Sequence, residues 1–294
     1  MKKYVIIGNG VAAAGCIEGI RSVDRDGEIT VVSEENHPVY CRPLISYYLE
    51  GKTKLENIGY RPADFYEKNN CRLLLGRRAQ RLEPDEKKVY LDDGTILSWD
   101  SICVAAGSSP FVPPMAGLDS VENKFGFMTL DDALAVEKAV DGDKRVLIIG
   151  AGLIGLKCAE GILGRAKSVT VCDLADRVLS SILDAESAAI MQSHLEKCGI
   201  GFMLGDTATS FDKNTAHMKS GRDVEFDVLI LAVGVRANSA LVKDAGGDAG
   251  RGIVIDGRCA ASLPDVYAAG DCTESRDASD GKIKVMALMP NAYM

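Results

Sequence analysis

Residues 4–15 read Tyr4-Val-Ile-Ile-Gly8-Asn-Gly10-Val-Ala-Ala13-Ala-Gly15. A short apolar run ends at Gly8, and small residues with helix-forming character follow Gly10, which is the order strand, tight turn and helix start. In such a turn Gly8 permits the sharp bend, Gly10 lets the backbone approach a phosphate, and Ala13 keeps the helix close to its strand. The free N–H groups of the helix start would face an anion. The stretch therefore predicts a cradle for the pyrophosphate of a dinucleotide.

The same pattern occurs again as Arg145-Val-Leu-Ile-Ile-Gly150-Ala-Gly152-Leu-Ile-Gly155. One match alone is weak support, but a repeat after about 140 residues indicates two copies of one fold rather than a solenoid. Each copy is followed by an apolar run that ends near an acid, Glu34 in the first and Asp173 in the second. Such a carboxylate can cap a helix or lie in solvent, but its distance from the first glycine favours hydrogen bonds to ribose hydroxyls.

Length and composition indicate a two-domain chain. With 294 residues, of which 47% are hydrophobic, it can bury two cores. Thirty-four basic and forty-two acidic side chains give a formal charge of −8, which argues against nucleic acid or an anionic membrane as the main partner. No apolar run approaches the ~18 residues of a membrane span, and no signal-peptide pattern precedes the first strand. We expect a cytoplasmic protein.

The nine cysteines form no C-x-x-C pair, and only three histidines are present. We therefore assign no metal site and expect reduced thiols. Cys103, Cys158 and Cys172 lie within apolar strand or helix patterns and are expected to be small buried hydrophobic residues.

A further acid follows the predicted strand in Asp265-Val-Tyr-Ala-Ala-Gly270-Asp271. Gly270 would allow a close approach, and the Asp271 carboxylate could accept a hydrogen bond from the ribityl chain of a flavin or cap a helix. Two cradles imply two dinucleotides. Flavin and nicotinamide are the economical pair, because the hydride of a nicotinamide needs an electron acceptor that the side chains do not offer.

Five landmarks follow one another along about 270 residues. They are Gly8-x-Gly10, Ala106-Gly107-Ser-Ser-Pro110, Gly150-x-Gly152-x-x-Gly155, Ala232-Val-Gly234-Val-Arg-Ala-Asn238 and Tyr267-Ala-Ala-Gly270-Asp271. In this order they resemble the FAD-dependent pyridine nucleotide-disulfide oxidoreductases. The loop Tyr40-Cys41-Arg42-Pro43 is most similar to the rubredoxin and ferredoxin reductase branch, which includes the nitrite-reductase-associated flavoproteins.

The resemblance implies an α/β fold with two Rossmann-like domains of the glutathione-reductase type, each with three layers in the order ββα. The FAD-binding domain would comprise residues 1–113 and 240–294, and the NAD(P)H-binding domain residues 114–239. Relatives continue into a C-terminal domain used for dimerisation or acceptor docking. We expect that domain to be absent here, either because the gene product is short or, as we favour, because the chain is cut at a domain boundary. Its absence would weaken FAD binding and allows for a dimer of the full-length protein.

The resemblance also implies the cofactor-binding residues. For FAD they are Gly8, Gly10, Val11, Ala12, Ala13, Glu34, Arg42, Pro43, Ala106, Gly107, Gly270 and Asp271. For NADH they are Gly150, Gly152, Leu153, Ile154, Gly155, Asp173, Val233 and Gly234. Asp173 favours NADH over NADPH because a carboxylate repels a 2′-phosphate. Arg177 lies nearby and would favour NADPH instead, unless its role is structural.

Two positions that face the flavin in relatives differ here. Many relatives pair a Lys on the helix near residues 43–50 with a Glu two positions after the third cradle glycine, and these positions are Tyr47 and Lys157 in this chain. One hypothesis is that Lys157 supplies the positive charge that stabilises reduced flavin. The alternative is that Lys157 faces solvent. Arg42 and Tyr47 would orient and tune the flavin.

The preferred function is an NADH-dependent FAD oxidoreductase that passes electrons to a small iron protein such as rubredoxin or ferredoxin. One alternative is a CoA-disulfide or thiol reductase acting through Cys41, although the C-x4-C pair of the disulfide reductases is absent and the single cysteine of the CoA-disulfide reductases aligns with Pro43. An NADH oxidase is a second alternative. A non-enzymatic alternative is a truncated nucleotide-binding module that senses redox state.

Overall fold

The computed structural model describes residues 1–294, which divide into two compact units. The first unit comprises residues 1–41, 59–109 and 236–294, and the second comprises residues 42–58 and 110–235. Residues 42–58, which the sequence placed with the FAD-binding domain, therefore cluster with the second unit. Each unit is described by itself below.

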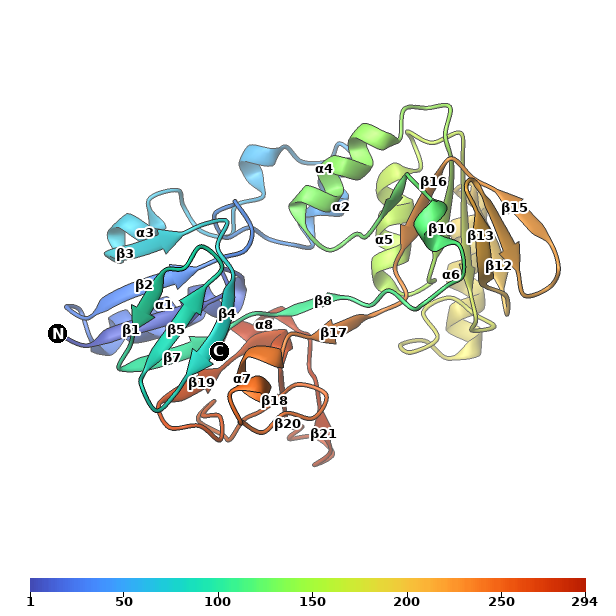
Figure 1. The fold of residues 1–294 in the computed structure, drawn as a ribbon. Helices are drawn as coiled ribbons and strands as arrows, with labels where there is room; N and C mark the ends of the chain where they lie inside the picture. Colours follow the sequence, from blue (N-terminus) through green and yellow to red (C-terminus); the bar gives the residue numbers. More distant parts are fainter. The chain divides into compact units, whose positions relative to one another are not determined.

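A five-stranded parallel sheet forms the centre of the first unit (Figure 1). The strands in spatial order are β19 (Val266–Ala268), β7 (Ser101–Val104), β1 (Lys3–Ile7), β2 (Glu28–Val32) and β3 (Cys71–Leu74). Ile7, the last residue of β1, is paired with both Val32 and Val104. The carboxyl ends of the three central strands thus lie at one edge, which is where open α/β sheets bind their ligands.

The two faces of this sheet carry different layers. Because successive side chains of a strand point to opposite faces, Ile6 packs on one side while Val5 and Ile7 pack on the other. The side of Ile6 is covered by α1 (Val11–Val23) and α3 (Phe65–Lys68). The other side is covered by an antiparallel sheet of β4 (Ala79–Glu83), β5 (Lys88–Leu91) and β6 (Ile96–Ser98). The unit therefore has three layers.

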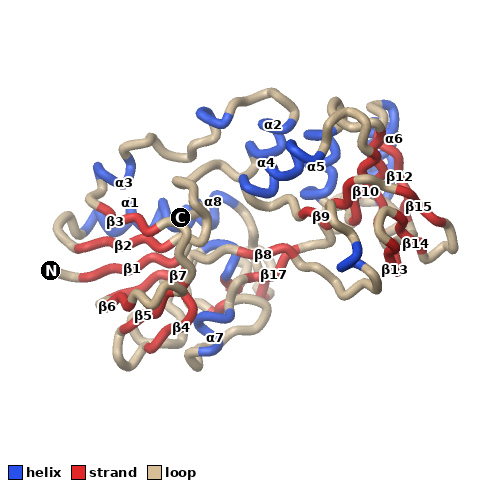
Figure 2. The backbone as a smooth tube through the Cα atoms, turned by 45° about the horizontal axis from the view of Figure 1, so that its top comes forward, coloured by secondary structure: helices blue, strands red, loops and turns tan.

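The second unit repeats this plan (Figures 1 and 2). Its five-stranded parallel sheet has the order β12 (Ile200–Leu204), β11 (Ser168–Asp173), β10 (Arg145–Ile149), β16 (Val228–Leu231) and β9 (Lys124–Phe125). Its antiparallel layer consists of β13 (Ala208–Asp212), β14 (Thr215–Met218) and β15 (Asp223–Glu225). Leu147, Ile149 and Phe211 form part of the core between the two sheets. The helices are α2 (Leu44–Leu49), α4 (Leu130–Ala139), α5 (Leu153–Ile162) and α6 (Ala185–Lys197).

The predicted α/β fold with two Rossmann-like units in ββα layers is confirmed. One difference separates the two sheets. The edge strand beside β7 is β19, which comes late in the chain, whereas the corresponding strand beside β16 is β9, which precedes the rest of its sheet.

Short elements complete the chain. They are η1 (Leu55–Asn57), β8 (Ser108–Pro110), η2 (Leu118–Ser120), β17 (Val235–Ala237), α7 (Ala240–Asp244), β18 (Ile253–Val254), η3 (Gly270–Cys272), β20 (Thr273–Arg276), β21 (Ile283–Lys284) and α8 (Met289–Tyr293). None of the helices combines the length and apolar sequence needed to cross a membrane.

In the hairpin formed by β5 and β6, the Asp-Gly turn places Gly94 at φ +83°. The helix α3 covers only Phe65–Lys68. It is bounded by Pro62 on one side and by Asn70, at φ 44°, on the other. Cys103, Cys158 and Cys172 are buried as expected.

Candidate cofactor-binding sites

The first glycine turn joins β1 to α1 and has the strained geometry of a phosphate cradle. Gly8 lies at φ +108°, and a Cβ there would come within 2.1 Å of the Ala105 carbonyl oxygen, so only glycine fits. Gly10 is the N-cap of α1 and offers no capping side chain. A Cβ at Gly10 would meet nothing within 4 Å. The first helical N–H groups, from Val11 to Ala13, lack intrahelical acceptors and border this open side, which suits an anion.

The structure brings the Gly270-Asp271 segment onto this helix start. Gly270 lies at φ +79°, and a Cβ added to it would lie 3.0 Å from the Cβ of Ala12. Asp271 is half-buried and follows as the second residue of η3, whose N-cap is Ala269. Asp271 is therefore not the N-cap of that turn, and it directly follows the glycine that contacts the cradle predicted from residues far earlier in the chain.

The Ala106-Gly107 turn also lies beside the first glycine, since the Ala106 nitrogen lies 3.2 Å from the Cβ position of Gly8. Asn238 holds this turn. Its backbone N–H donates to the Gly107 oxygen at 3.0 Å, and its Nδ2 donates to the Ala106 oxygen at 2.8 Å. The landmarks of the first unit thus converge on one sheet edge.

Two neighbouring acids follow β2, and they differ in environment. Glu34, the predicted ribose ligand, is exposed. Glu35 is half-buried and its Oε2 accepts a hydrogen bond of 2.6 Å from the Tyr40 hydroxyl. Glu35 is a second candidate for the ribose carboxylate. The number of residues between Gly8 and the acid could not distinguish Glu34 from Glu35, because this number varies by more than one residue.

The second glycine turn has the same steric constraints. Gly150 lies at φ +115°, with a Cβ position 2.2 Å from the Ala232 oxygen, and a Cβ at Gly155 would lie 2.0 Å from the Gly150 oxygen. Gly152 is the N-cap of α5, without a capping side chain and with nothing within 4 Å of its Cβ position. Leu153 is 57% exposed and Ile154 is half-buried at this helix start.

Asp173 ends β11 and contacts the cradle directly. Its Oδ2 accepts from the Ala151 N–H at 2.6 Å, and its Oδ1 accepts from the Ala175 N–H at 2.8 Å. Each carboxylate oxygen has a second lone pair, so two ribose hydroxyls can still be accepted. Arg177 instead donates to Asp176 Oδ1 at 3.0 Å and to the Ser180 oxygen at 3.4 Å. These local contacts favour a structural role for Arg177.

Val233 and Gly234 follow β16 at the same edge of the second sheet. Val233 is half-buried, and Gly234 is exposed at φ +122°. The Gly234 oxygen accepts a hydrogen bond of 2.9 Å from the Phe111 N–H.

The residues expected to tune the flavin lie on or next to α2, within the second unit. The Arg42 Nη1 donates to the Met128 oxygen at 2.8 Å, and Pro43 is the N-cap of α2. Tyr47 is 40% exposed, and the Lys157 Nζ lies 5.1 Å from its ring centroid, within cation–π range. Lys157 also forms an ion pair of 2.6 Å with Glu160. The structure therefore brings Tyr47 and Lys157 together, with the Lys157 side chain 38% exposed.

A hydrogen-bond network fixes α2 to α4 and α5. The Tyr48 hydroxyl donates to Glu137 Oε2, while Arg165 Nη2 donates to Glu137 Oε1 at 2.8 Å. The bond to Glu137 raises the pKa of Tyr48. The absence of a side chain at Gly161 of α5 allows α2 to approach closely. The Ser46 oxygen lies 3.0 Å from the position that a Cβ of Gly161 would take. This packing explains why residues 42–58 belong to the second unit.

The cysteines near the sites have contrasting environments. Cys41, the alternative redox thiol, is half-buried. Cys272 follows Asp271 and is fully buried, and burial raises its pKa to about 11, which disfavours the reactive thiolate. No three His, Cys, Asp or Glu side chains gather into a group that could hold a metal ion.

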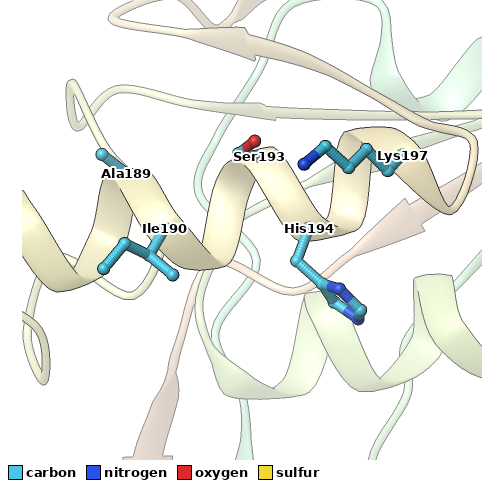
Figure 3. A pocket seen from close by; sticks show the side chains of 5 residues that line it. All are labelled: Ala189, Ile190, Ser193, His194 and Lys197. Carbon is cyan, nitrogen blue, oxygen red and sulfur yellow. The ribbon is translucent and has the colours of Figure 1, made fainter.

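A shallow hollow lies over α6 (Figure 3). Its lining residues, shown as sticks in Figure 3, are Ala189, Ile190, Ser193, His194 and Lys197. None of them belongs to a glycine turn, so this hollow is not a dinucleotide site.

Comparison with known sequences decides the family. The family described as pyridine nucleotide-disulphide oxidoreductase matches residues 2–294. The chain belongs to the pyridine nucleotide-disulphide oxidoreductase family. The predicted resemblance is thus confirmed over almost the whole chain.

Individual members of this family give the scale of the similarity. The assimilatory nitrate reductase electron transfer subunit of Bacillus subtilis (strain 168) is 32% identical over 278 residues, which cover 93% of this chain and 36% of that protein. The NADH oxidase of Methanocaldococcus jannaschii is 33% identical over 292 residues, or 95% of this chain and 65% of that protein. The chain therefore spans only about a third of the length of the first of these relatives and under two thirds of the second.

Among solved structures, that of a covalent putidaredoxin reductase–putidaredoxin complex superimposes with a TM-score of 0.93 at 27% identity. The match covers 99% of this chain and 72% of that one. It agrees with the Rossmann-like architecture of both units.

FAD and NADH are the cofactors that membership of the pyridine nucleotide-disulphide oxidoreductase family implies. The residues present fit two dinucleotides. Each cradle has an N-cap glycine open on one side, uncapped N–H groups for a pyrophosphate, and a carboxylate near the end of the next strand.

Proposed function

We propose that this chain is an NADH-dependent FAD oxidoreductase that passes electrons from NADH to a small iron redox protein. The observation that carries the proposal is the presence of two sterically equivalent glycine cradles, of which the first alone packs against a Gly-Asp turn at Gly270. The relatives support the same function, since one is an electron transfer subunit and another was solved in complex with putidaredoxin.

In this proposal FAD belongs to the first unit and NADH to the second. When bound, FAD supplies the chemistry of accepting two electrons from NADH and releasing them singly. The N–H groups after Gly10 bind its pyrophosphate, Asp271 accepts from the ribityl chain, and the ribose carboxylate is Glu34 or its better-packed neighbour Glu35. Glu35 is favoured by its ordered contact with Tyr40.

In the second unit, the N–H groups after Gly152 bind the NADH pyrophosphate and Asp173 accepts from its ribose. Two backbone amides already fix the Asp173 carboxylate, so its negative charge is pre-positioned against a 2′-phosphate. This geometry supports NADH over NADPH.

Tyr47, Lys157 and Arg42 complete the proposal as orienting residues. Lys157 is held over the Tyr47 ring and by Glu160, so its ammonium has a defined position from which to stabilise negative charge. Arg42 is held by the Met128 carbonyl.

An anaerobic titration tests the central claim. FAD-loaded protein is mixed with increasing NADH in the absence of oxygen, and the visible flavin absorbance is followed. Stoichiometric bleaching is expected. Bound flavin that stays oxidised in excess NADH would refute the proposal.

The similarity to an NADH oxidase supports a second candidate, in which oxygen is the electron acceptor. Stopped-flow reoxidation of the reduced protein by oxygen and by a rubredoxin or ferredoxin distinguishes the two. Thiol reduction through Cys41 is tested by Cys41→Ser, which abolishes NADH-dependent disulfide reduction only if that thiol carries it. The cytoplasmic location, the dimer and the exclusion of nucleic acid stay predictions.

A further inference from the structure

One side chain outside all the sequence landmarks contacts the centre of the first cradle. The Tyr66 hydroxyl, on α3, donates a hydrogen bond of 2.6 Å to Asn9 Oδ1. Asn9 is the residue between Gly8 and Gly10, so its backbone is the turn itself. Tyr66 is 57 positions away in sequence, and nothing in the spacing of the glycines indicates it.

The same hydroxyl also contacts the loop after β2. It accepts a hydrogen bond of 3.0 Å from the Val39 N–H, and Asn9 Nδ2 donates to the His37 oxygen at 3.2 Å. A backbone N–H can only donate, so the Tyr66 proton must be given to Asn9. Both polar ends of the Asn9 amide are therefore satisfied, and this fixes the orientation of the side chain.

The element that presents Tyr66 is itself firmly attached. Phe65, its neighbour on α3, is buried in the core beside α1, and the two rings contact edge to face with centroids 5.2 Å apart. Beyond the C-terminal end of α3, Arg21 of α1 donates to the Asn69 oxygen at 2.7 Å. Burial also raises the pKa of Tyr66, so its hydroxyl keeps its proton throughout the neutral range.

We propose that Tyr66 is a positioning residue for FAD, because its hydroxyl fixes through Asn9 the turn whose N–H groups receive the pyrophosphate. This inference rests on the proposed function, which places FAD in the first cradle. Without the hydroxyl, Asn9 Oδ1 loses its hydrogen-bond donor and the turn samples conformations that do not bind FAD. The affinity for FAD then falls, because part of the binding free energy is used to select the turn conformation that binds FAD.

The test compares Tyr66→Phe with Tyr4→Phe as a matched control. Tyr4 also donates its hydroxyl to a side chain, Asp24 Oδ2 at 2.9 Å, but at the far end of β1. The dissociation constant of FAD is measured by flavin fluorescence, alongside the thermal midpoint of each apoprotein. We expect Tyr66→Phe to weaken FAD binding by about three- to tenfold, consistent with loss of one net hydrogen bond, and Tyr4→Phe to leave it within twofold.

A double-mutant cycle separates positioning from general stability. Asn9→Ala should weaken FAD binding by a similar factor. Tyr66→Phe combined with Asn9→Ala should bind FAD no more weakly than Asn9→Ala alone, because each substitution removes the Tyr66–Asn9 hydrogen bond through which the effect on FAD is proposed to act. NADH binding to the second unit should be unchanged in all variants.

The outcomes are distinct. If Tyr66→Phe bound FAD as tightly as wild type but had a lowered thermal midpoint, Tyr66 would have only a structural role and the inference would be overturned. Additive losses of FAD affinity in the double variant would also overturn it. Absence of FAD binding by the wild-type protein would instead overturn the proposed function itself.

Discussion

At the scale of single residues, the two cradles depend on glycines, because backbone atoms of other residues occupy the positions that a Cβ would take. At Gly8 and Gly150, a backbone carbonyl oxygen lies where a Cβ would clash with it. The same is true of Gly155, which lies within a helix. These contacts are with backbone atoms, which cannot rotate away as a flexible side chain can. Even a substitution by alanine at these positions should therefore disrupt the cradle.

Gly155→Ala tests this constraint. The added methyl group would lie 2.0 Å from the Gly150 oxygen, so α5 must move away from β10. We expect a loss of about 1–3 kcal/mol in the free energy of unfolding, the usual range for overpacking. Urea unfolding followed by circular dichroism measures it. Gly164→Ala is the control, because nothing lies within 4 Å of its Cβ position, and equal midpoints for the two variants would contradict the argument.

Asp173→Asn tests the second carboxylate. The substitution replaces one acceptor oxygen by an N–H₂ group that faces a backbone N–H, and it removes the charge that repels a 2′-phosphate. We expect NADH affinity to fall by about tenfold, as for the loss of a charged hydrogen bond, while the preference for NADH over NADPH shrinks. Fluorescence titrations with both nucleotides measure the change. Asp176→Asn, at an 81% exposed side chain nearby, should behave as wild type.

At the scale of elements, an ion pair joins the starts of the two central strands of the second sheet. Arg145, the first residue of β10, donates through Nε and Nη2 to the two carboxylate oxygens of Asp227 at 3.0 Å each. Asp227 immediately precedes β16. This contact lowers the pKa of Asp227 from 3.8 to about 2.

The shift gives a pH-dependent prediction. Because the pKa of Asp227 is lower in the folded state, the pair contributes stability that is fully present above about pH 4 and is lost as the pH falls toward about 2. Both side chains are partly exposed, so we expect about 1 kcal/mol. Wild type and Asp227→Asn are compared by urea unfolding between pH 6 and pH 3. A difference that stays constant over that range would exclude the ion pair as its source.

Sequence reasoning located the strands, helices and both glycine turns, because hydrophobic periodicity and glycine spacing are local signals. It did not identify contacts between distant side chains. Tyr66 with Asn9, Glu35 with Tyr40, and Tyr48 with Glu137 depend on how helices pack, which no spacing encodes. The same limit applies to residues 42–58, which the sequence placed with the FAD-binding domain and which cluster with the second unit.

At the scale of the whole molecule, each unit has its own parallel sheet, its own antiparallel layer and its own cradle. The pyrophosphates of the two nucleotides should therefore bind to separate parts of the chain. A ligand that orders one cradle lowers local opening there without needing to affect the other.

Hydrogen exchange followed by mass spectrometry tests this separation. FAD is expected to slow amide exchange in peptides that contain residues 8–14 and 269–272, and NADH in peptides that contain residues 150–156 and 173–175. The reduction should be at least about tenfold for amides that open locally, as for a ligand at ten or more times its dissociation constant. Protection of the same cradle by both nucleotides would contradict the assignment of one cofactor to each unit.

The different origins of β9 and β19 have a consequence for protein synthesis. All strands of the second sheet have left the ribosome once Leu231 emerges, so this unit can fold while translation continues. The first sheet must wait for residues 266–268, because Tyr267 pairs with Cys103 at the edge of β7. During that interval the nascent chain carries an unpaired strand edge, the kind of surface that aggregates or recruits a chaperone.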